Sequence, residues 1–357
     1  KFSNELSEHY NEIKFEEITD CAEKLLQLDP WADQVRFTRS GGEASAVATR
    51  LARAASGKDI VAVCGYHGWH DWYLSANHGD SDNLSEHLLP GLSTTGIPKA
   101  LIGTTLGFRY NDFAGLKKLV SEHKIGAIQM EVKRNIEPAD NFLTKVRSLC
   151  DQKGIVLVFD ECSSGFRETS SGLYKKYDVV PDAVIYGKAL GNGYAINAIV
   201  GKREVMMQAQ NSFISSTFWT ERIGSAAALK CLEVMQREKS WDVCTQAGNR
   251  VQNMWKEISD KNQLPIKISG LPALSSFVFC HHDHLKYKTF ITQEMLKLGI
   301  LASNIFYIST AHTDSHFKIY FDALNDIFYS LKSLERSGSI DELLETEVCY
   351  AGFGRMN

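Results

Sequence analysis

The chain has 357 residues, of which 44% are hydrophobic and 23% are charged, as is typical of a globular protein with one large or two ordinary domains. The formal net charge of −4 provides no basic footprint for nucleic acid, and no apolar run approaches the roughly 18 residues that cross a bilayer. Because the polar first residues resemble no signal or transit peptide and the eight scattered cysteines contain no CxxC pair, we expect a cytoplasmic protein with reduced thiols and no membrane or nucleic-acid partner.

The first two thirds of the chain alternate between helical and strand-like patterns. Small and apolar residues at helical spacing predict a helix over residues 43–56, which Gly57 is placed to end. Further on, we expect strands in DIVAVCG and in DAVIYGK, helices over 112–123 and 141–153, and strands over 125–131 and 155–161. These strands are continuously apolar, so they favour a mainly parallel sheet covered by helices, with ligands at the carboxyl ends of its strands.

The pattern changes after residue 235. A long helical pattern over 225–260 leads into a strand-like pair in IKISGLPALSSFVFC, followed by a helix in TFITQEMLKLG, a strand, and a last helix near FDALNDIFYSLKSLERSG. This order predicts a smaller C-terminal α+β domain. The expected divisions are an N-terminal segment (1–35, truncated), a large domain (36–235), a small domain (236–345) and a tail (346–357).

Two charged residues fall at the carboxyl ends of predicted strands. Lys188 follows a buried strand and precedes Gly191 and Gly193, so its amine could attack an aldehyde, or it could be a surface lysine with a buried stem. Asp160, in VLVFDE, is costly to bury unless it is paired. It could hold a protonated ring nitrogen, or it could cap the segment that starts near Cys162.

The stretch RSGGEA precedes the predicted helix over 43–56. Backbone amides at a helix start attract anions, and glycine lets a phosphate approach, so Ser40, Gly41 and Gly42 form a candidate phosphate site. The alternative is an ordinary Ser/Gly cap. The chain contains no G-x-x-x-x-G-K-[ST] motif, which argues against a nucleotide P-loop.

Aromatic and histidine residues follow the strand-like run DIVAVC. In GYHGWHDWY, Tyr66 could stack on a flat cofactor. The alternative is a metal cluster of His67, His70 and Asp71. The later HHDH, residues 281–284, is expected to be a polar hairpin tip, and no metal site is expected.

Together these features are more specific than any one of them. A phosphate-type helix start, a stacking aromatic, an aspartate for a ring nitrogen and a lysine for an aldehyde are the four contacts that pyridoxal 5′-phosphate (PLP) needs. The sequence resembles the class III aminotransferases, which are PLP enzymes of fold type I, on the branch with glutamate-1-semialdehyde aminomutase. The family's S-G-T-E-A, Y-H-G, F-D-E-V-x-[ST]-G-F-R and G-K-x-[LI]-G-x-G are matched by SGGEA (40–44), YHG (66–68), FDECSSGFR (159–167) and GKALGNG (187–193).

The resemblance implies a role for each matching residue. Lys188 would form the internal aldimine and shuttle the proton, and Asp160 would keep the pyridine nitrogen protonated. Tyr66 would stack on the ring, and Thr217 would reach the phosphate of the neighbouring subunit's cofactor in a homodimer. The other residues placed at the cofactor are Ser40, Gly41, Gly42, His67, Glu131 and Asn135.

Three departures from the family pattern bear on the substrate. Gly42 stands where the family usually has threonine or serine, so one hydroxyl contact to the phosphate is missing or is supplied elsewhere. TFWTER, residues 217–222, replaces the usual T-x-x-G-N-P. Only 39 residues precede Ser40, fewer than the family usually has.

The resemblance implies transfer of an amino group from a donor such as glutamate to a carbonyl acceptor, with a keto or aldehyde sugar as the expected acceptor. The alternative is glutamate-1-semialdehyde 2,1-aminomutase, which would use the same lysine and aspartate. A non-catalytic protein with this fold is the third hypothesis, and the presence of both Lys188 and Asp160 argues against it.

Overall fold

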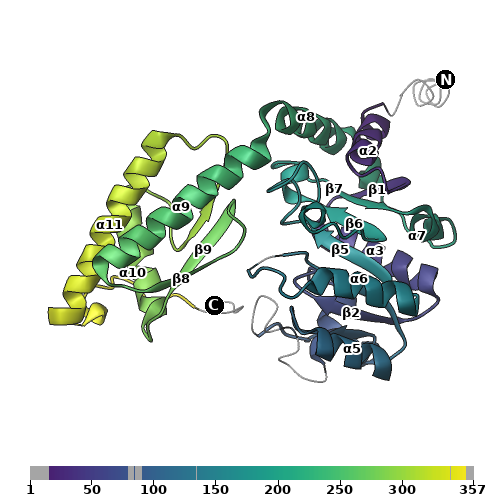
Figure 1. Ribbon diagram of the computed structural model, residues 1–357, viewed down its shortest axis with the longest axis horizontal. Helices are drawn as coiled ribbons and strands as arrows, with labels where there is room; N and C mark the ends of the chain where they lie inside the picture. Colours follow the sequence, from purple (N-terminus) through teal and green to yellow (C-terminus); the bar gives the residue numbers. More distant parts are fainter. Residues whose placement is uncertain (1–15, 79–83, 85–90, 134, 338, 351–357) are drawn as a thin grey trace, which may run out of the picture.

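The computed structural model describes residues 16–78, 84, 91–133, 135–337 and 339–350. Residues 1–15 of the predicted N-terminal segment and residues 351–357 of the predicted tail lie outside the described residues. Figure 1 shows a helix-covered sheet joined through two consecutive helices to a smaller helix-and-strand unit.

A seven-stranded sheet carries the N-terminal two thirds of the fold. Its order is β1 (Gln34–Thr38), β7 (Asn197–Gly201), β6 (Ala183–Tyr186), β5 (Val156–Glu161), β4 (Ile125–Met130), β2 (Ile60–Cys64), β3 (Thr105–Gly107). Only β7 pairs antiparallel with its neighbours, and the remaining pairs are parallel, so the mainly parallel sheet is confirmed. Every residue of β4, β6 and β7 is buried, which explains why these strands show no polar alternation.

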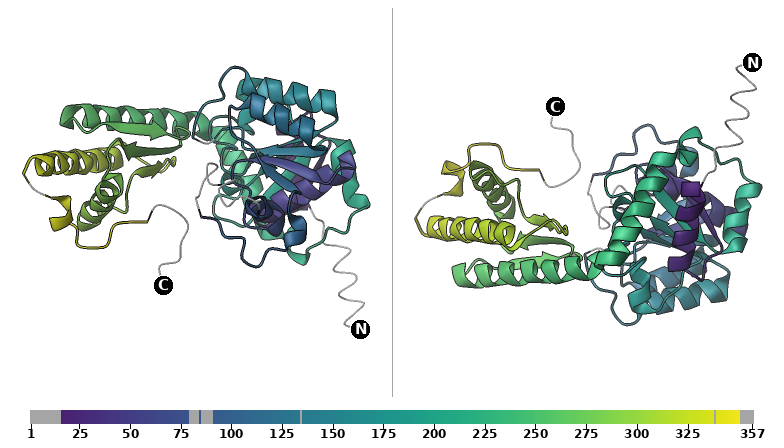
Figure 2. Two further views of the ribbon diagram at one scale, coloured as in Figure 1. Left: turned by 90° about the horizontal axis from the view of Figure 1, so that it is seen from below. Right: turned by 90° about the horizontal axis from the view of Figure 1, so that it is seen from above.

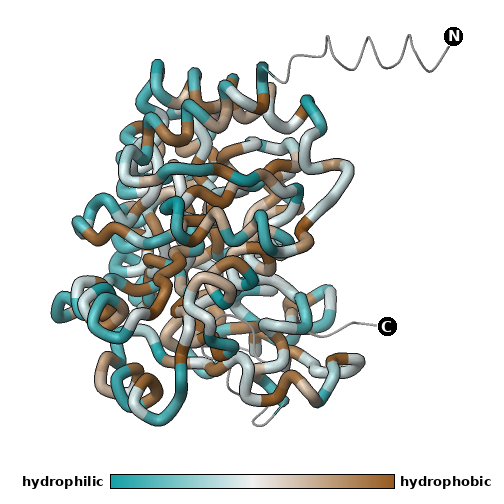
Figure 3. The backbone as a smooth tube through the Cα atoms, turned by 90° about the vertical axis from the view of Figure 1, so that its right-hand side faces the viewer, coloured by the Kyte–Doolittle hydropathy of each residue, from teal (hydrophilic) through white to brown (hydrophobic). Residues whose placement is uncertain are grey.

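Helices pack on both faces of this sheet (Figures 1 and 2). One face carries α3 (Gly41–Ser56) with the short helices α4 (Asp71–Leu74) and α7 (Arg203–Met206). The other carries α2 (Glu16–Leu28), α5 (Phe113–Glu122), α6 (Phe142–Lys153) and α8 (Arg222–Glu238). In Figure 3 the hydrophobic residues concentrate in the central strands, and hydrophilic residues dominate the outer turns. The strands are therefore covered on both sides, as continuously apolar strands require.

The C-terminal unit has a hydrophobic core of its own. Its antiparallel sheet has the order β10 (Ile305–Tyr307), β9 (Leu274–Phe279), β8 (Ile266–Ser269), and its helices are α9 (Ser240–Asn262), α10 (His284–Lys297) and α11 (Asp314–Ser337). Trp255 is fully buried there, and its indole N–H donates to the hydroxyl of Tyr320 at 2.9 Å.

Single 3₁₀ turns connect several of these elements. They are η1 (Ser75–Asn77), η2 (Lys99–Leu101), η3 (Leu173–Tyr177), η4 (Lys188–Leu190), η5 (Met207–Gln210), η6 (Thr217–Thr220) and η7 (Ile340–Glu342). Among the described residues, no helix is long and apolar enough to cross a membrane.

Two sequence-based predictions need correction. The helical pattern over 225–260 is two helices rather than one, because Lys239 adopts a left-handed conformation with φ of 47° and ends α8 before α9 begins. The HHDH stretch is not a hairpin tip, since it lies between β9 and α10 and its last residue begins α10. The structure also contains α2, β1, β3 and β7, which the pattern did not predict.

Candidate active site

Four adjacent strands deliver the candidate residues to one edge of the large sheet. In the order β6, β5, β4, β2, the residues at or just beyond the carboxyl ends are Lys188, Asp160, Glu131 and Tyr66. Because neighbouring parallel strands run in the same direction, their carboxyl ends meet at the same edge of the sheet. The parallel topology therefore gathers residues that lie far apart in the sequence.

Asp160 is buried, with 4% of its surface exposed, and both of its carboxylate oxygens make polar contacts. Its Oδ2 contacts Nδ1 of His67 at 2.8 Å and accepts from the Ser45 hydroxyl at 3.3 Å, while its Oδ1 accepts from the Cys162 amide at 3.1 Å. Burial opposes ionisation, but the hydrogen bond and charge of His67 outweigh it and hold the pKa of Asp160 below its ordinary value. The site thus holds a carboxylate that stays charged. The Cys162 contact also realises the local cap considered from the sequence, although as a turn and not as the start of a helix.

Lys188 sits in a constrained backbone position at the end of β6. Its φ is 40°, which is uncommon for a residue with a side chain and is found disproportionately at functional sites. The preceding Gly187 is required by space, since a Cβ there would lie 2.0 Å from the Asn197 side-chain oxygen. The Lys188 ammonium donates to the hydroxyl of Ser163, and the side chain is exposed in this chain. The amine is therefore reachable, and the strand end sets its position.

Glu131 fixes the turn that carries Tyr66. Its Oε2 accepts from the Tyr66 amide at 3.2 Å, and its own amide donates to the Cys64 carbonyl at 3.0 Å. Gly65 lies in the left-handed region with φ of 118°, and a Cβ there would come within 2.6 Å of the Glu131 carboxylate. Glu131 is thus a buried support for the half-buried Tyr66 ring.

The sequence predicted an anion site at the start of α3, and Ser40 makes an ordinary cap there. The Ser40 hydroxyl accepts from the Glu43 amide at 3.3 Å, and Glu43 accepts from the Ser40 amide at 3.1 Å. Within the described part of the chain, no acceptor is bonded to the amides of Gly41 and Gly42, as expected for the first turn of a helix. Ser45, one turn further on, donates to Asp160, so the same helix serves both positions.

Two predicted residues lie apart from this group. Thr217, at the start of η6, is exposed. Asn135 is also exposed, and its carbonyl accepts from the Gly270 amide at 3.4 Å. None of the contacts among the described residues joins either side chain to Asp160 or Lys188.

Sequence reasoning missed Arg39, which organises the loops around the α3 start. Its guanidinium donates to the carbonyls of Ala195, Phe218 and Glu221, and it pairs with the Glu221 carboxylate at 2.9 Å. These bonds tie the phosphate-type turn to the segment that carries Thr217. A charged residue directly before SGGEA was the available signal, but its partners are more than 150 residues away in the sequence.

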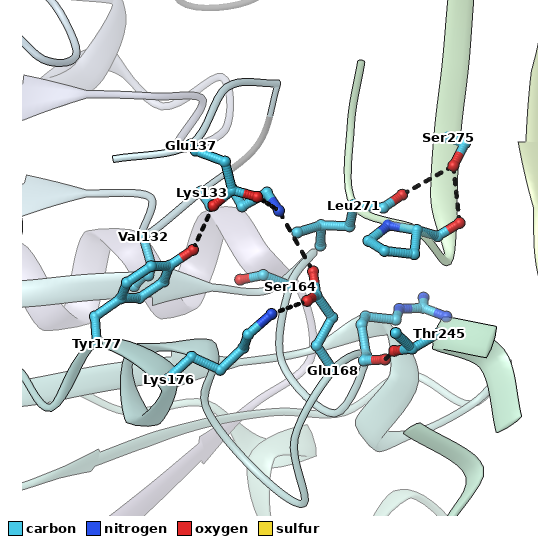
Figure 4. Close-up of polar contacts among 12 residues, drawn as sticks. Val132, Lys133, Glu137, Ser164, Glu168, Lys176, Tyr177, Thr245, Leu271 and Ser275 are labelled. Carbon is cyan, nitrogen blue, oxygen red and sulfur yellow. Dashed lines mark hydrogen bonds and ion pairs between the residues drawn. The ribbon is translucent and has the colours of Figure 1, made fainter. Parts of the chain in front are cut away.

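An ionic network around the buried side chains of Lys133 and Glu168 lies beyond Glu131, where the β4–α6 and β5–η3 loops meet (Figure 4). Lys133 bonds Glu137 and lies 3.6 Å from Glu168, which also pairs with Lys176. Tyr177 donates to Glu137 at 2.8 Å, and the bonds from Lys133 and Tyr177 keep the pKa of Glu137 below its ordinary value although burial opposes ionisation. This network joins the β4–α6 loop to the β5–η3 loop.

The metal cluster of His67, His70 and Asp71 that the sequence left open is not formed among the described residues. His67 is bonded to Asp160 instead. One ligand atom each from His281, His282 and Asp283 in the C-terminal unit lie within 4.8 Å of one another. The Lys286 ammonium is 3.4 Å from Asp283 and already compensates that carboxylate.

The residues present fit the PLP that the sequence resemblance implies. The helix start offers unbonded amides for a phosphate, and Gly42 leaves a side-chain-free surface beside them. Nδ1 of His70 is buried beside Gly42 and has no hydrogen-bond partner among the described residues. An anionic group in this place would satisfy these donors.

The chain is similar to known proteins over most of its length. The family model for class III aminotransferases matches residues 4–325. The chain is 30% identical to 3-aminobutyryl-CoA aminotransferase of Cloacimonas acidaminovorans, covering 87% of this chain and 74% of that one. It is 28% identical to 2′-deamino-2′-hydroxyneamine transaminase of Streptomyces kanamyceticus, covering 86% and 75%. It is 30% identical to glutamate-1-semialdehyde 2,1-aminomutase of Methanosphaera stadtmanae, covering 90% and 78%.

The fold is also shared with a solved PLP protein. The PLP internal aldimine form of the FumI protein from Sphingopyxis sp. MTA144 superposes with a TM-score of 0.80 at 22% identity, over 92% of this chain and 78% of that one. The mostly parallel sheet therefore matches fold type I of the PLP transferases. The chain belongs to the class III aminotransferases, a family of transaminases whose cofactor is PLP.

Proposed function

We propose that this protein moves an amino group from an amino-acid donor, glutamate, to a carbonyl acceptor. One observation carries the proposal: an exposed amine, Lys188, and a buried charged carboxylate, Asp160, leave neighbouring parallel strands beside an anion-ready helix start. When bound, PLP supplies an aldehyde that takes up the amino group and an electron-withdrawing ring.

Each residue has a defined task in this proposal. Lys188 would hold the cofactor through its amine. Once the amino group of the substrate has displaced it, the free amine would carry the proton between the substrate carbon and the cofactor carbon. The Asp160 carboxylate keeps a proton on the ring nitrogen, since an adjacent negative charge stabilises the protonated form. His67 and Ser45 hold that carboxylate in place, and Tyr66 covers the ring.

We also propose a homodimer in which Thr217 reaches the neighbouring subunit's cofactor. Thr217 is exposed in the single chain, and large apolar side chains beside it are exposed as well: 91% for Phe213, 68% for Phe218 and 64% for Ile223. Such exposure near a predicted site is typical of a surface that another chain covers. Sedimentation analysis tests the dimer.

We also propose a cytoplasmic location, which the eight cysteines, all free, support.

For the acceptor we propose a keto or aldehyde sugar. The support is the TFWTER segment, which departs from the usual family motif, and a relative whose name is that of a 2′-deamino-2′-hydroxyneamine transaminase. The second candidate function, the 2,1-aminomutase reaction, is supported by the relative of that name at 30% identity. The two reactions differ in whether they need an amino donor: the transfer reaction needs one, whereas the aminomutase reaction consumes glutamate 1-semialdehyde without a separate donor.

The test begins with the absorption spectrum of the protein loaded with PLP, followed by glutamate. We expect a band from lysine-bound PLP that converts to the pyridoxamine phosphate spectrum. Borohydride reduction and peptide mass spectrometry should place the cofactor on Lys188, and Lys188→Ala should keep its circular dichroism while losing the band.

Three results would contradict parts of this proposal. Cofactor trapped on another lysine would refute the assignment of Lys188. A spectrum that glutamate leaves unchanged would refute glutamate as the donor. Formation of 5-aminolevulinate from glutamate 1-semialdehyde alone would favour the aminomutase reaction over transfer to a sugar.

A further inference from the structure

The imidazole of His70 occupies the space that a side chain at position 42 would need. A Cβ on Gly42 would lie 2.7 Å from Cε1 and 2.8 Å from Nδ1 of His70, closer than real Cβ contacts come. Trp69 stacks on the same ring, with centroids 4.7 Å apart and planes at 20°. The ring therefore packs against both an indole and the first turn of α3.

One ring nitrogen of His70 has no partner in the described part of the chain. His70 Nδ1 is buried, yet no hydrogen bond reaches it within the described residues. His70 precedes α4, but its side chain makes no capping bond to that helix. A buried imidazole nitrogen without a partner is costly, so its environment calls for a group that the protein itself does not supply.

The backbone beside the ring attracts negative charge. The helix α3 has 16 residues, and its first turn offers the amides of Gly41 and Gly42 with the positive end of the helix dipole. The backbone of Gly68 also comes close, since a Cβ there would lie 2.9 Å from the Gly42 Cα. Gly42 and Gly68 have no side chains, so the backbone at the helix start lies close to the His70 ring.

We propose that His70 is a ligand of the cofactor phosphate in this protein and takes the place of a hydroxyl side chain at position 42. The proposal rests on the proposed function, because it needs PLP to bind at the α3 start. From the sequence pattern, His70 was considered only as a candidate metal ligand, and the proposal gives it a different contact. It also explains the glycine at position 42, since His70 and a side chain at that position exclude each other.

The phosphate group provides a direct test that does not depend on turnover. Apo-protein is titrated with PLP and, separately, with pyridoxal, which has the same aldehyde and ring but no phosphate. The ratio of the two dissociation constants, followed by absorbance, isolates the phosphate contribution in each variant. We expect His70→Ala to weaken PLP binding by roughly 10- to 100-fold, the usual effect of losing a hydrogen bond to a charged group, and to leave pyridoxal binding unchanged.

The matched variant places the hydroxyl back. Gly42→Ser alone should weaken PLP binding, because its Cβ collides with the His70 ring. In the His70→Ala background the same serine has room, so the double variant should recover most of the lost PLP affinity. Such a reversal of sign between the two backgrounds is a coupling that two independent residues would not produce.

The outcomes separate the two levels of the argument. If the wild-type protein forms no lysine-bound PLP, the proposed function fails. If it does, but His70→Ala leaves the ratio of PLP to pyridoxal affinity unchanged, the phosphate role of His70 is refuted. An equal loss of both ligands refutes it too. If His70→Ala does not fold, His70→Gln, which keeps an amide donor, should retain the wild-type ratio, whereas His70→Leu should lose it. Equal ratios in these two variants would overturn the proposal.

Discussion

Replacing Asp160 by asparagine removes one charge from the candidate site and almost no volume. The carboxylate accepts three contacts, from His67, Ser45 and the Cys162 amide, and only 4% of its surface is exposed. The asparagine oxygen can still accept from the Cys162 amide, and its NH₂ group can face His67 and Ser45, each of which is able to accept. We therefore expect Asp160→Asn to fold and to bind PLP.

The electrostatic loss sets the size of the effect on catalysis. A carboxylate beside a protonated ring nitrogen raises the pKa of that nitrogen by about 1–3 units, and each unit corresponds to about 1.4 kcal/mol. Without it, the ring holds its proton less often, and carbon deprotonation should slow by roughly 10- to 1,000-fold.

The assay is the half-reaction with glutamate, followed in a stopped-flow spectrometer under single-turnover conditions. Ser45→Ala is the matched control, because it removes one hydrogen bond to the same carboxylate and leaves its charge. We expect less than about a tenfold effect for that control. A rate for Asp160→Asn within about threefold of the wild type, with PLP bound, would refute the assignment of Asp160 to the ring nitrogen.

Three further predictions concern stability, measured by urea denaturation. Burial opposes ionisation of Asp182, but hydrogen bonds from the Leu157 amide at 2.8 Å and from Lys202 at 2.7 Å, together with the charge of Arg147, hold its pKa below the ordinary 3.8. The resulting stability is present above pH 3.8 and is lost as pH falls through the lowered pKa, so Asp182→Asn should cost about 2 kcal/mol at pH 7 and less below about pH 4. Lys133→Met should cost about 1–3 kcal/mol, because Glu168, with 2% of its side chain exposed, loses one of its two cations. Tyr320→Phe should cost about 1–2 kcal/mol, because it leaves the buried indole N–H of Trp255 unpaired.

Each of these has an outcome that contradicts it. A constant difference between Asp182→Asn and wild type from pH 7 to pH 3 would show that the carboxylate charge is not the source. Unchanged stability of Lys133→Met would mean that Lys176 alone compensates Glu168. Tyr329→Phe serves as the control for Tyr320→Phe, because that ring is 69% exposed, and equal losses in the two variants would contradict the argument from burial.

Most of the large sheet was predictable because its strands are continuously apolar and bounded by glycine or charge. The helix expected over 43–56 ends at Ser56 as predicted and begins two residues earlier, at Gly41. By contrast, the three-residue strand β3 was missed, and so were β1 and β7. Asn197 and Thr38 are polar residues inside these strands, and both are buried, so local composition gave a weak signal.

The break between α8 and α9 depended on a single backbone angle. The residues around Lys239 continue a helical pattern, and neither glycine nor proline marks the interruption. A left-handed lysine is stabilised by its surroundings and not by its own preference, so the sequence pattern favoured one long helix.

The sequence by itself determined the sheet strands that carry the site and the residue types at their ends, because a buried strand must be apolar and a catalytic residue must be polar. It also determined the family, through motifs whose spacing is local. Only the tertiary structure decided that His67 and Ser45 contact the carboxylate of Asp160. It also decided that the amine of Lys188 donates to the hydroxyl of Ser163, and that the ring of His70 fills the space beside Gly42. These contacts join residues on different strands, helices and loops, so they depend on distances in space that no local pattern encodes.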